Sequence, residues 1–271
     1  MKVLRLRESK LTILKIGGSV ITDKSKELQV RMQTINRLAK EIEKASIPNL
    51  IIVHGGGSFG HPIAQRHAIA EGLKEDTQKI GFSETHHVMT VLNGLFIDAL
   101  VWCDIPAVSI TPSSCIITKD GRIQHFEDTP LKRLLRMGFL PVLYGDAILD
   151  SKLGFTILSG DQLTSVLATR LNAGRVIIGV DVNGLYDEDP KVGKSSSIFS
   201  RLTLEELRGL QSKLDRPRVC DVTGGMLGKI AELIPVIEHG IPAIIVNATK
   251  PDYIYSVLKG NKVKSTLIEK E

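Results

Sequence analysis

Two glycine-rich segments, each directly after an apolar run, carry residue types suited to binding phosphate. The first is KIGGS at 15–19, after the run LTIL, and the second is HGGGSFGH at 54–61, after the run NLIIV. Glycine lets backbone amides approach phosphate oxygens closely, because no Cβ keeps the two apart. Parallel strands that end in such turns direct their amides towards one edge of the sheet. The pattern predicts a phosphate site at that edge, beside a lysine and a histidine.

The second segment also fits the dinucleotide-binding pattern G-x-G-x-x-G through Gly55, Gly57 and Gly60. That interpretation requires an acidic residue about 20 residues further on, at the end of the next strand. Glu75 and Asp76 have this spacing, but they lie in the polar stretch EGLKEDTQK with no apolar strand before it. The context of a dehydrogenase is therefore missing. The later segment GGMLGK lacks both the spacing and the final Ser or Thr of a P-loop.

Five charged residues lie beside these turns or at the ends of other predicted elements: Lys15, Lys24, Asp161, Asp181 and Lys229. Lys15 ends an apolar strand, so its burial requires an anionic partner. Asp161 opens a helix after LSG, where an acid is also favoured simply as an N-cap or first-turn residue. Asp181 lies at the carboxyl end of RVIIGV, where open α/β sheets bind ligands. Lys229 could extend over a phosphate chain or be a solvated helix residue.

The elements that must position these residues alternate between short apolar runs and longer helical patterns. Such alternation predicts an α/β fold, a three-layer α/β/α sandwich around a mainly parallel sheet. The expected strands are 11–16, 50–54, 106–110, 140–145, 175–180 and 242–247. The expected helices are 30–45, 62–71, 84–103, 160–173, 203–212 and 226–239. Two further stretches, CIITKDGRIQ and DAILDSKLGFTIL, predict β-hairpin insertions.

The 271 residues are enough for one large domain or two closely joined lobes. A soft boundary falls near residue 174, where the second half begins with its own strand. We therefore expect an N-terminal lobe, 1–173, and a C-terminal lobe, 174–271, both on one continuous sheet. The segment DPKVGKSSS is expected to be a mobile loop.

Composition limits the classes of partner. The net charge is +5, but the 35 basic residues are interleaved with 30 acidic ones, and no basic stretch carries aromatic residues. This argues against nucleic-acid binding and fits an anionic ligand. No apolar segment approaches the roughly 18 residues of a membrane span. Cys103, Cys115 and Cys220 are far apart, which indicates reduced thiols, and we expect a cytoplasmic protein.

Five segments in this order carry a resemblance to a known family: KIGGSVITDK, IIVHGGGSFGH, LSGDQL, GVDVNGLYDEDP and VTGGMLGK. Together they resemble the amino acid kinase superfamily over about Leu11 to Leu267. The acceptor-side segment GSFGH, ending in His61, is similar to the isopentenyl phosphate kinases and to the fosfomycin-phosphorylating kinases. The resemblance implies the amino acid kinase fold, with ATP as donor, Mg²⁺ arriving with ATP, a small phosphate monoester as acceptor and a homodimer. It also implies that lobe 1–173 holds the acceptor and the phosphate loops and that lobe 174–271 holds ATP.

The implied reaction is ATP-dependent phosphorylation of isopentenyl phosphate to isopentenyl diphosphate, by direct in-line transfer. A phosphate acceptor needs no general base, because its second pKa of about 6 leaves it mostly dianionic at neutral pH. The resemblance implies that Lys15 and Lys229 neutralise charge on the transferred and leaving phosphates and that Lys24 orients the phosphates. Asp161 would orient the lysines, and His61 would donate to the acceptor phosphate, whose charge would favour the imidazolium.

The remaining implied contacts fall into two sets. Those to ATP, besides Lys15 and Lys229, are Gly17, Gly18, Ser19, Gly57, Asp181, Tyr186 and Gly225. Those along the path to the acceptor are Gly56, Gly57, Gly60, His61 and Gly160. The apolar tail would lie on a stripe at helical spacing formed by Met89, Leu92, Phe96 and Ile97, although such a stripe is also typical of a core or dimer interface.

Three alternatives stay open. A phosphonate kinase or a nucleoside monophosphate kinase would share this chemistry, and a non-catalytic nucleotide-binding protein would share the fold. Neighbouring His86 and His87 cannot share one helix face, so no metal site is expected there.

Overall fold

The structure, a computed structural model, describes residues 10–187, 197–214 and 224–271. Its central sheet has the strand order β10-β12-β11-β9-β1-β2-β6-β3. Neighbours pair in parallel except β11 with β12. The bounds are β1 Thr12–Ile16, β2 Leu50–His54, β3 Ala107–Ser109, β6 Leu140–Tyr144, β9 Arg175–Val180, β10 Arg201–Thr203, β11 Ala243–Asn247 and β12 Ser265–Glu269. The mainly parallel sheet predicted from the sequence is confirmed.

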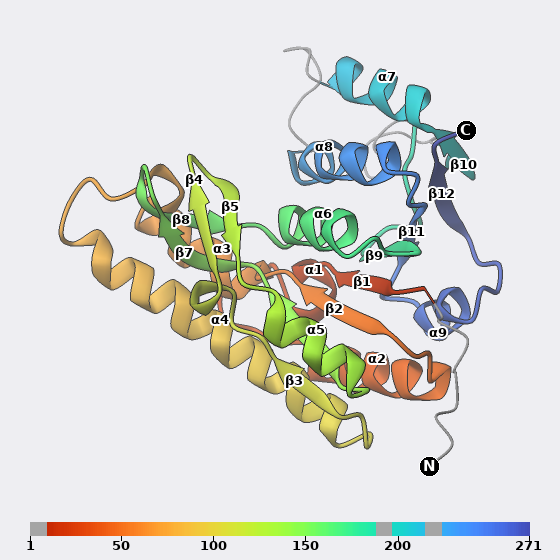
Figure 1. Cartoon of the computed structure of the whole chain (residues 1–271), viewed down its shortest axis with the longest axis horizontal. Helices are drawn as coiled ribbons and strands as arrows, with labels where there is room; N and C mark the ends of the chain where they lie inside the picture. The colour runs from red at the N-terminus through yellow and green to blue at the C-terminus, as the bar shows by residue number, and fades with distance from the viewer. Residues whose placement is uncertain (1–9, 188–196, 215–223) are drawn as a thin grey trace.

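Helices cover both faces of this sheet (Figure 1). One apolar core includes Ile13 of β1 and lies against α6 and α8, and the other includes Leu14 and lies against α2, α4 and α9. Because successive side chains of a strand point to opposite faces, this alternation divides the helices into two layers. The helices are α1 Gly18–Ile21, α2 Met32–Ala45, α3 Gly57–Arg66, α4 Gln78–Val101, α5 Thr129–Arg136, α6 Gly160–Arg170, α7 Leu204–Leu214, α8 Gly224–Glu238 and α9 Tyr253–Leu258.

Both predicted hairpins are present and form a second sheet in the order β5-β4-β7-β8. Its strands are β4 Ile116–Lys119, β5 Arg122–Phe126, β7 Asp146–Asp150 and β8 Gly154–Leu158. The carboxylate of Asp150 joins the two turns, because it accepts hydrogen bonds from the amides of Gly121 and Leu153, both at 2.8 Å. In Figure 1 this sheet and the N-terminal half of α4 project from the left of the main body.

Several helix boundaries differ from the prediction. The helix expected over 62–71 begins at Gly57, inside the glycine run. The helix expected over 84–103 begins at Gln78, whose side chain accepts hydrogen bonds from the amides of Lys74 and Glu75. This start was missed because the residues around Gln78 belong to the polar stretch EGLKEDTQK, which shows no apolar helical spacing. The short elements α1, α5, α9, β10 and β12 were not predicted, and most of DPKVGKSSS lies outside the described residues.

The sheet runs without interruption across the expected lobe boundary near residue 174. β9 pairs with β1 from Thr12 with Arg175 to Ile16 with Gly179, and the amide of Gly174 donates to the carbonyl oxygen of Leu11 at 2.8 Å. The two halves of the chain therefore share one sheet, while their division into acceptor and ATP lobes stays a prediction.

Candidate active site

The carboxyl end of β1 places a buried lysine against an acidic helix start. Lys15 is only 3% exposed, and its Nζ lies 2.8 Å from Oδ1 of Asp161. Asp161 is in the first turn of α6, and the N-cap is Ser159, whose hydroxyl accepts a hydrogen bond from the amide of Gln162 at 3.0 Å. The anionic partner that the burial of Lys15 required is therefore Asp161.

A second lysine reaches the same carboxylate from α8. Nζ of Lys229 lies 3.8 Å from Oδ2 of Asp161. Burial alone would raise the pKa of Asp161, but Lys15 and Lys229 outweigh it and hold that pKa below its usual range. Burial also lowers the pKa of Lys229, and Lys15 adds to this effect while Asp161 and Asp181 oppose it. One carboxylate is thus shared by two ammonium groups.

His61 lies near this cluster, on α3. Although its side chain is exposed, partial desolvation is the first cause that lowers its pKa, followed by the charges of Lys229, Lys15 and Lys24. Asp161 acts in the opposite direction. The charges of the other four predicted catalytic residues, Lys15, Lys24, Asp161 and Lys229, therefore all reach His61. The imidazolium predicted for the phosphate-bound state would need the charge of the phosphate to reverse this shift.

The two glycine loops touch backbone to backbone. A Cβ on Gly18 would overlap the backbone of Gly57, and Gly57 has a φ of +51°, which few other residues adopt without strain. Thr22 joins the loops, because its hydroxyl donates to the carbonyl oxygen of Gly18 at 2.8 Å and accepts from the amide of Ser58 at 3.0 Å. Glycine is required here for the approach of one loop to the other as well as for any approach to phosphate.

One predicted phosphate donor is already used within the protein. The amide of Gly17 donates to the carbonyl oxygen of Gly179 at 2.8 Å. In this structure that amide extends the pairing of β1 with β9, so a contact of Gly17 with an ATP phosphate stays a prediction and finds no support from this amide. Contacts from Gly18 and Ser19, which follow at the start of α1, stay predictions. Gly160 is also tightly placed, since a Cβ there would lie 3.2 Å from the carbonyl oxygen of His54.

The predicted tail stripe divides into two parts. Met89 packs against the second glycine loop, because a Cβ at Gly56 or Gly60 would lie within 3 Å of its sulfur, at 2.8 and 2.9 Å respectively. Leu92 and Phe96 are completely buried in the core beneath the sheet. They therefore belong to the core in this structure, and their predicted contact with an acceptor has no exposed surface to support it.

Polar residues that sequence reasoning missed lie at the predicted nucleotide end. The missed residues are Asn183, in the turn after Asp181 and β9, and Asn247, at the end of neighbouring β11. The side-chain amide of Asn183 donates to the hydroxyl of Tyr186 at 3.2 Å and accepts from the side-chain amide of Asn247 at 3.2 Å. The signal was present, because each asparagine lies at or just after the carboxyl end of an apolar strand. Gly225 lies in the first turn of α8.

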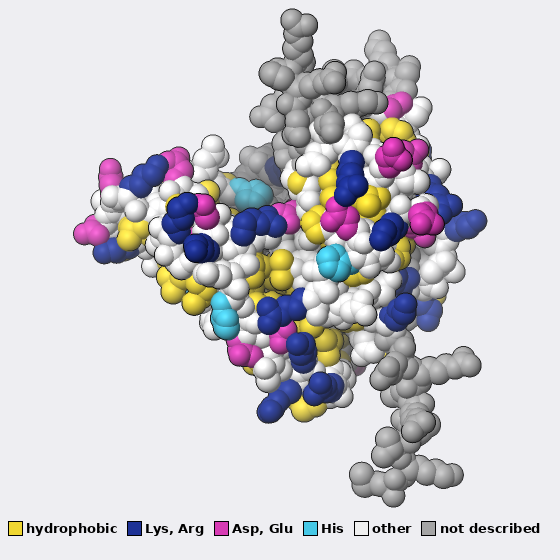
Figure 2. Space-filling model, turned by 45° about the horizontal axis from the view of Figure 1, so that its top comes forward, with side chains coloured by type: hydrophobic (Ala, Val, Ile, Leu, Met, Phe, Trp, Pro, Cys, Tyr) yellow, Lys and Arg dark blue, Asp and Glu magenta, His cyan; other side chains and the backbone are white. Residues whose placement is uncertain are grey.

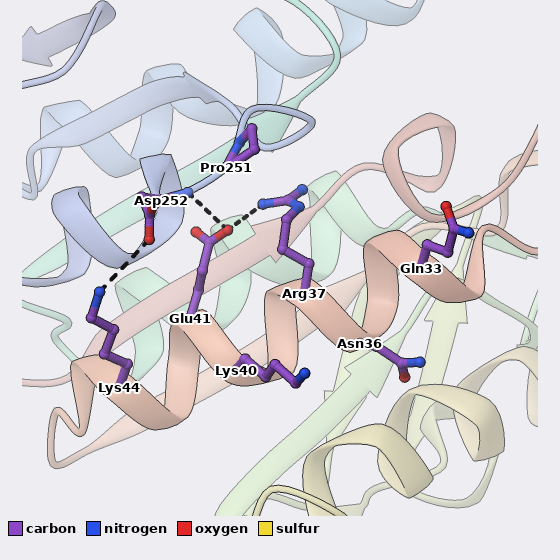
Figure 3. A pocket seen from close by; sticks show the side chains of 8 residues that line it. All are labelled: Gln33, Asn36, Arg37, Lys40, Glu41, Lys44, Pro251 and Asp252. Carbon is purple, nitrogen blue, oxygen red and sulfur yellow. Dashed lines mark hydrogen bonds and ion pairs between the residues drawn. The ribbon is translucent and has the colours of Figure 1, made fainter.

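A separate surface cavity of about 490 Å³ lies between α2 and the segment before α9 (Figure 3). Arg37 donates to the carbonyl oxygens of Ala248 and Lys250 at 2.5 and 3.1 Å and pairs with Glu41. Glu41 in turn accepts from the amide of Asp252 at 3.1 Å. The charged groups drawn in Figure 3 thus largely hold the segment after β11 in place.

The predicted catalytic residues lie instead around the carboxyl end of β1, with Asp161 on α6, Lys229 on α8 and His61 on α3. Figure 2 shows a hollow between the left-hand projection and the main body, with basic, acidic and histidine side chains along it. In the part of the chain that the structure describes, no group of three or more His, Cys, Asp or Glu side chains could hold a metal ion.

Two expectations about composition meet the structure only in part. Cys103 and Cys115 are free thiols, both half-buried, whereas Cys220 lies outside the described residues. None of the helices within residues 10–187, 197–214 and 224–271 has the length and apolar character needed to cross a bilayer.

Comparison with known proteins agrees with this arrangement. Residues 10–247 match the amino acid kinase family. The isopentenyl phosphate kinase of Methanothermobacter thermautotrophicus is 40% identical over 95% of this chain and 98% of its own. That of Methanocaldococcus jannaschii is 35% identical over 96% and 98%. A solved isopentenyl phosphate kinase superposes with a TM-score of 0.84 at 37% identity, covering 95% of this chain and 99% of its own. The chain belongs to the amino acid kinase family and groups there with the isopentenyl phosphate kinases.

Proposed function

We propose that this protein transfers the γ-phosphoryl group of ATP to isopentenyl phosphate, giving isopentenyl diphosphate and ADP. The observation that carries the proposal is the gathering of cations around Asp161 and His61. Lys15 and Lys229 share Asp161, and the charge of Lys24 also reaches His61. Two polyanions repel each other, so a site that brings them together must supply cations and amide groups at their junction.

Each charged group then has a distinct task. Lys15 and Lys229 neutralise the charge of the transferred phosphoryl group and of the leaving β-phosphate, and Lys24 orients the phosphates. Asp161 holds the two lysines in place and takes no proton, because its pKa is held low by them despite burial. The acceptor phosphate is its own nucleophile, so positioning and charge neutralisation supply the catalysis.

The acceptor phosphate would lie at the start of α3. His61 donates to it, and Gly56 and Gly60 keep the loop open for its approach. Three residues after His61, Ala64 begins a small apolar cluster with Ala147 and Phe155. Partly buried Phe82 and Ile157 border that cluster. This second apolar region is a better candidate for the hydrocarbon tail than buried Leu92 and Phe96, because part of its surface is exposed.

The donor set fits a nucleotide whose phosphates carry their own metal ion. Lys15 and Lys229 lie beside Asp161, whose carboxylate is already bound to Lys15. Mg²⁺ commonly binds through phosphate oxygens and few protein carboxylates, and there it would neutralise charge on the ATP phosphates. Asp181, Asn183, Tyr186 and Asn247 lie where the remainder of the nucleotide would bind.

A homodimer and a cytoplasmic location complete the proposal. The outer face of α4 exposes Ile80, Val91, Val101 and Trp102, and the last of these is 87% exposed. The helix lies beside β3, the edge strand of the central sheet. A second copy covering this face would bury those side chains, and sedimentation at micromolar concentration should give twice the monomer mass.

The function is tested by a panel of acceptors. Purified protein is supplied with Mg-ATP and, separately, isopentenyl phosphate, fosfomycin or UMP, and ADP formation is measured together with the phosphorylated product. The expected result is efficient turnover of isopentenyl phosphate, at least about 100-fold above the other two in kcat/KM, a difference of about 3 kcal/mol. Preference for fosfomycin or UMP would reassign the acceptor, and no ADP with any acceptor would indicate a nucleotide-binding protein without turnover.

A further inference from the structure

The turn between β4 and β5 reaches from the hairpin sheet to the two helices that carry Asp161 and Lys229. In Figure 1 the two strands rise beside α6 and the N-terminal end of α8. An exposed hairpin turn ordinarily has few contacts beyond its own strands. This turn is bound from three sides, by Asp150, Gln162 and Glu232.

Gln162 ties the turn to the start of α6. It is 5% exposed, and both ends of its amide are used. Its oxygen accepts from the amide of Ile123 at 3.0 Å, and its nitrogen donates to the carbonyl oxygen of Gly121 at 2.9 Å. A buried amide satisfied at both ends holds one geometry strongly. Because Gln162 directly follows Asp161, the turn fixes the backbone that presents the shared carboxylate.

Arg122 ties the same turn to α8. Both terminal nitrogens of its guanidinium contact the carboxylate of Glu232, the second of them at 3.1 Å. Such a two-point pair fixes orientation as well as distance. Glu232 is three residues after Lys229, so the two side chains lie on neighbouring positions of one helix face. The glutamate side chain is 15% exposed and the arginine side chain 61%, so solvent screens the pair from the arginine side only.

We infer that Arg122 and Gln162 are positioning residues for phosphoryl transfer, acting through Glu232 and the start of α6 to hold Lys229 beside Asp161. The direct contact of Lys229 with Asp161, at 3.8 Å, is long compared with the 2.8 Å of Lys15. A contact of that length leaves the position of α8 to other interactions. The hairpin turn supplies one, because it binds both helices at once. The inference rests on the proposed function for its catalytic consequence.

Charge reversal tests the inference. Arg122→Glu and Glu232→Arg each place like charges in contact, whereas the double variant restores an opposite pair in reversed orientation. We expect each single variant to lose about tenfold in kcat and in affinity for a non-hydrolysable Mg-ATP analogue, with KM for isopentenyl phosphate within about twofold of wild type. The double variant should recover to within about threefold, which a loss of general stability would not explain.

A matched control lies on the same sheet. Lys152 and Asp120 form an ion pair at 2.6 Å, both more than half exposed, and this pair joins the two hairpin turns to each other and not to α8. Lys152→Glu should therefore change kcat and nucleotide affinity by less than about twofold. Gln162→Glu keeps the acceptor for Ile123 but loses the donor to Gly121, and it should lower kcat while the melting temperature stays within a few degrees.

Two results would overturn the inference. One is wild-type kcat and nucleotide affinity in both single charge reversals, and the other is a double variant no better than either single one. Nucleotide affinity is measured by calorimetry without an acceptor, so it tests the positioning of Lys229 even if the acceptor has been assigned wrongly. Absence of wild-type turnover with isopentenyl phosphate would count against the proposed function alone.

Discussion

The gap around Asp161 and the cavity between α2 and the segment before α9 both gather basic side chains, but they satisfy them differently. In the cavity, Arg37 donates to two backbone carbonyl oxygens and pairs with Glu41. In the gap, Lys15 and Lys229 both contact the carboxylate of Asp161, and Asp181 also acts on Lys229. The cavity uses its charges to hold the chain, whereas the gap gathers buried cations at the carboxyl end of β1.

This difference shows which property marks the ligand site. A hollow whose charges are paired with the protein itself is already stable without a ligand. Burying cations around one carboxylate carries a desolvation cost that an anionic ligand would offset. We therefore expect the ligand to bind where buried cations gather beside the two glycine loops, and the size of a hollow is a poor guide.

Removing one cation from each region tests whether the gap serves catalysis and the cavity serves stability. Lys15→Met should lower kcat by about 1,000-fold, because it removes the ammonium group that neutralises the transferring phosphoryl group. Its binding of Mg-ATP should weaken less than its kcat falls. The measurement is steady-state ADP release with isopentenyl phosphate, with circular dichroism to show that the variant is folded.

Arg37→Met is the matched variant in the cavity. It leaves buried Glu41 without its cation and two carbonyl oxygens without a donor, so the free energy of unfolding should fall by about 3 kcal/mol. The activity of the folded fraction should stay within about twofold. Equal losses of activity in the two variants would remove the distinction between the regions.

The acceptor side of the gap gives the next largest effect. His61→Ala should lower kcat/KM for isopentenyl phosphate by about 100-fold, with little change in nucleotide affinity. Desolvation and then the lysine charges lower the pKa of His61 without ligand, whereas a phosphate dianion raises it. Acceptor binding at pH 7 should therefore take up protons. Calorimetry in buffers of different ionisation enthalpy should detect this uptake in wild type and not in His61→Gln.

His54, unlike His61, is buried away from the gap, and its titration is expected to affect stability. It is completely buried, stacked on Tyr144, and Nε2 lies 3.2 Å from Oδ1 of Asn93. Burial lowers its pKa to about 4. The unfolded chain binds a proton below about pH 6.5, while the folded chain stays neutral until about pH 4. The contribution of neutral His54 to the free energy of unfolding is therefore fully present above pH 6.5, and up to about 3 kcal/mol of it is lost as the pH falls towards 4.

Urea denaturation at pH 7 and at pH 4.5 measures the change in the free energy of unfolding. Other groups titrate in the same range, so their contribution is subtracted by comparing wild type with His54→Gln. His54→Gln should be less stable at pH 7 but should lose less on acidification than wild type does. An identical loss in both proteins would show that His54 is not the group responsible.

The charged cluster could be predicted because it follows from sheet geometry. The carboxyl ends of parallel strands meet at one edge, so Lys15 at the end of β1 and the glycines after β2 had to lie together. The requirement that buried Lys15 have an anionic partner was also a local argument. Its solution, Asp161 at the start of α6, was identified through the family resemblance.

What could not be predicted depends on contacts between distant segments. Nothing in KDGR indicates that this turn binds Gln162 and Glu232, because both partners come from helices much later in the chain. The use of the Gly17 amide by Gly179 likewise follows from the pairing of β1 with β9. The apolar stripe on α4 gave the correct helix but could not distinguish core residues from a tail pocket.

Two phosphate groups should meet in the gap where cations gather beside the glycine loops. A crystal structure with a non-hydrolysable ATP analogue, Mg²⁺ and isopentenyl phosphate would show whether they do. We expect the γ-phosphate beside Lys15 and the acceptor phosphate beside His61, with Lys229 still near Asp161. Phosphates bound elsewhere, or the acceptor in the cavity beside Arg37, would contradict this expectation.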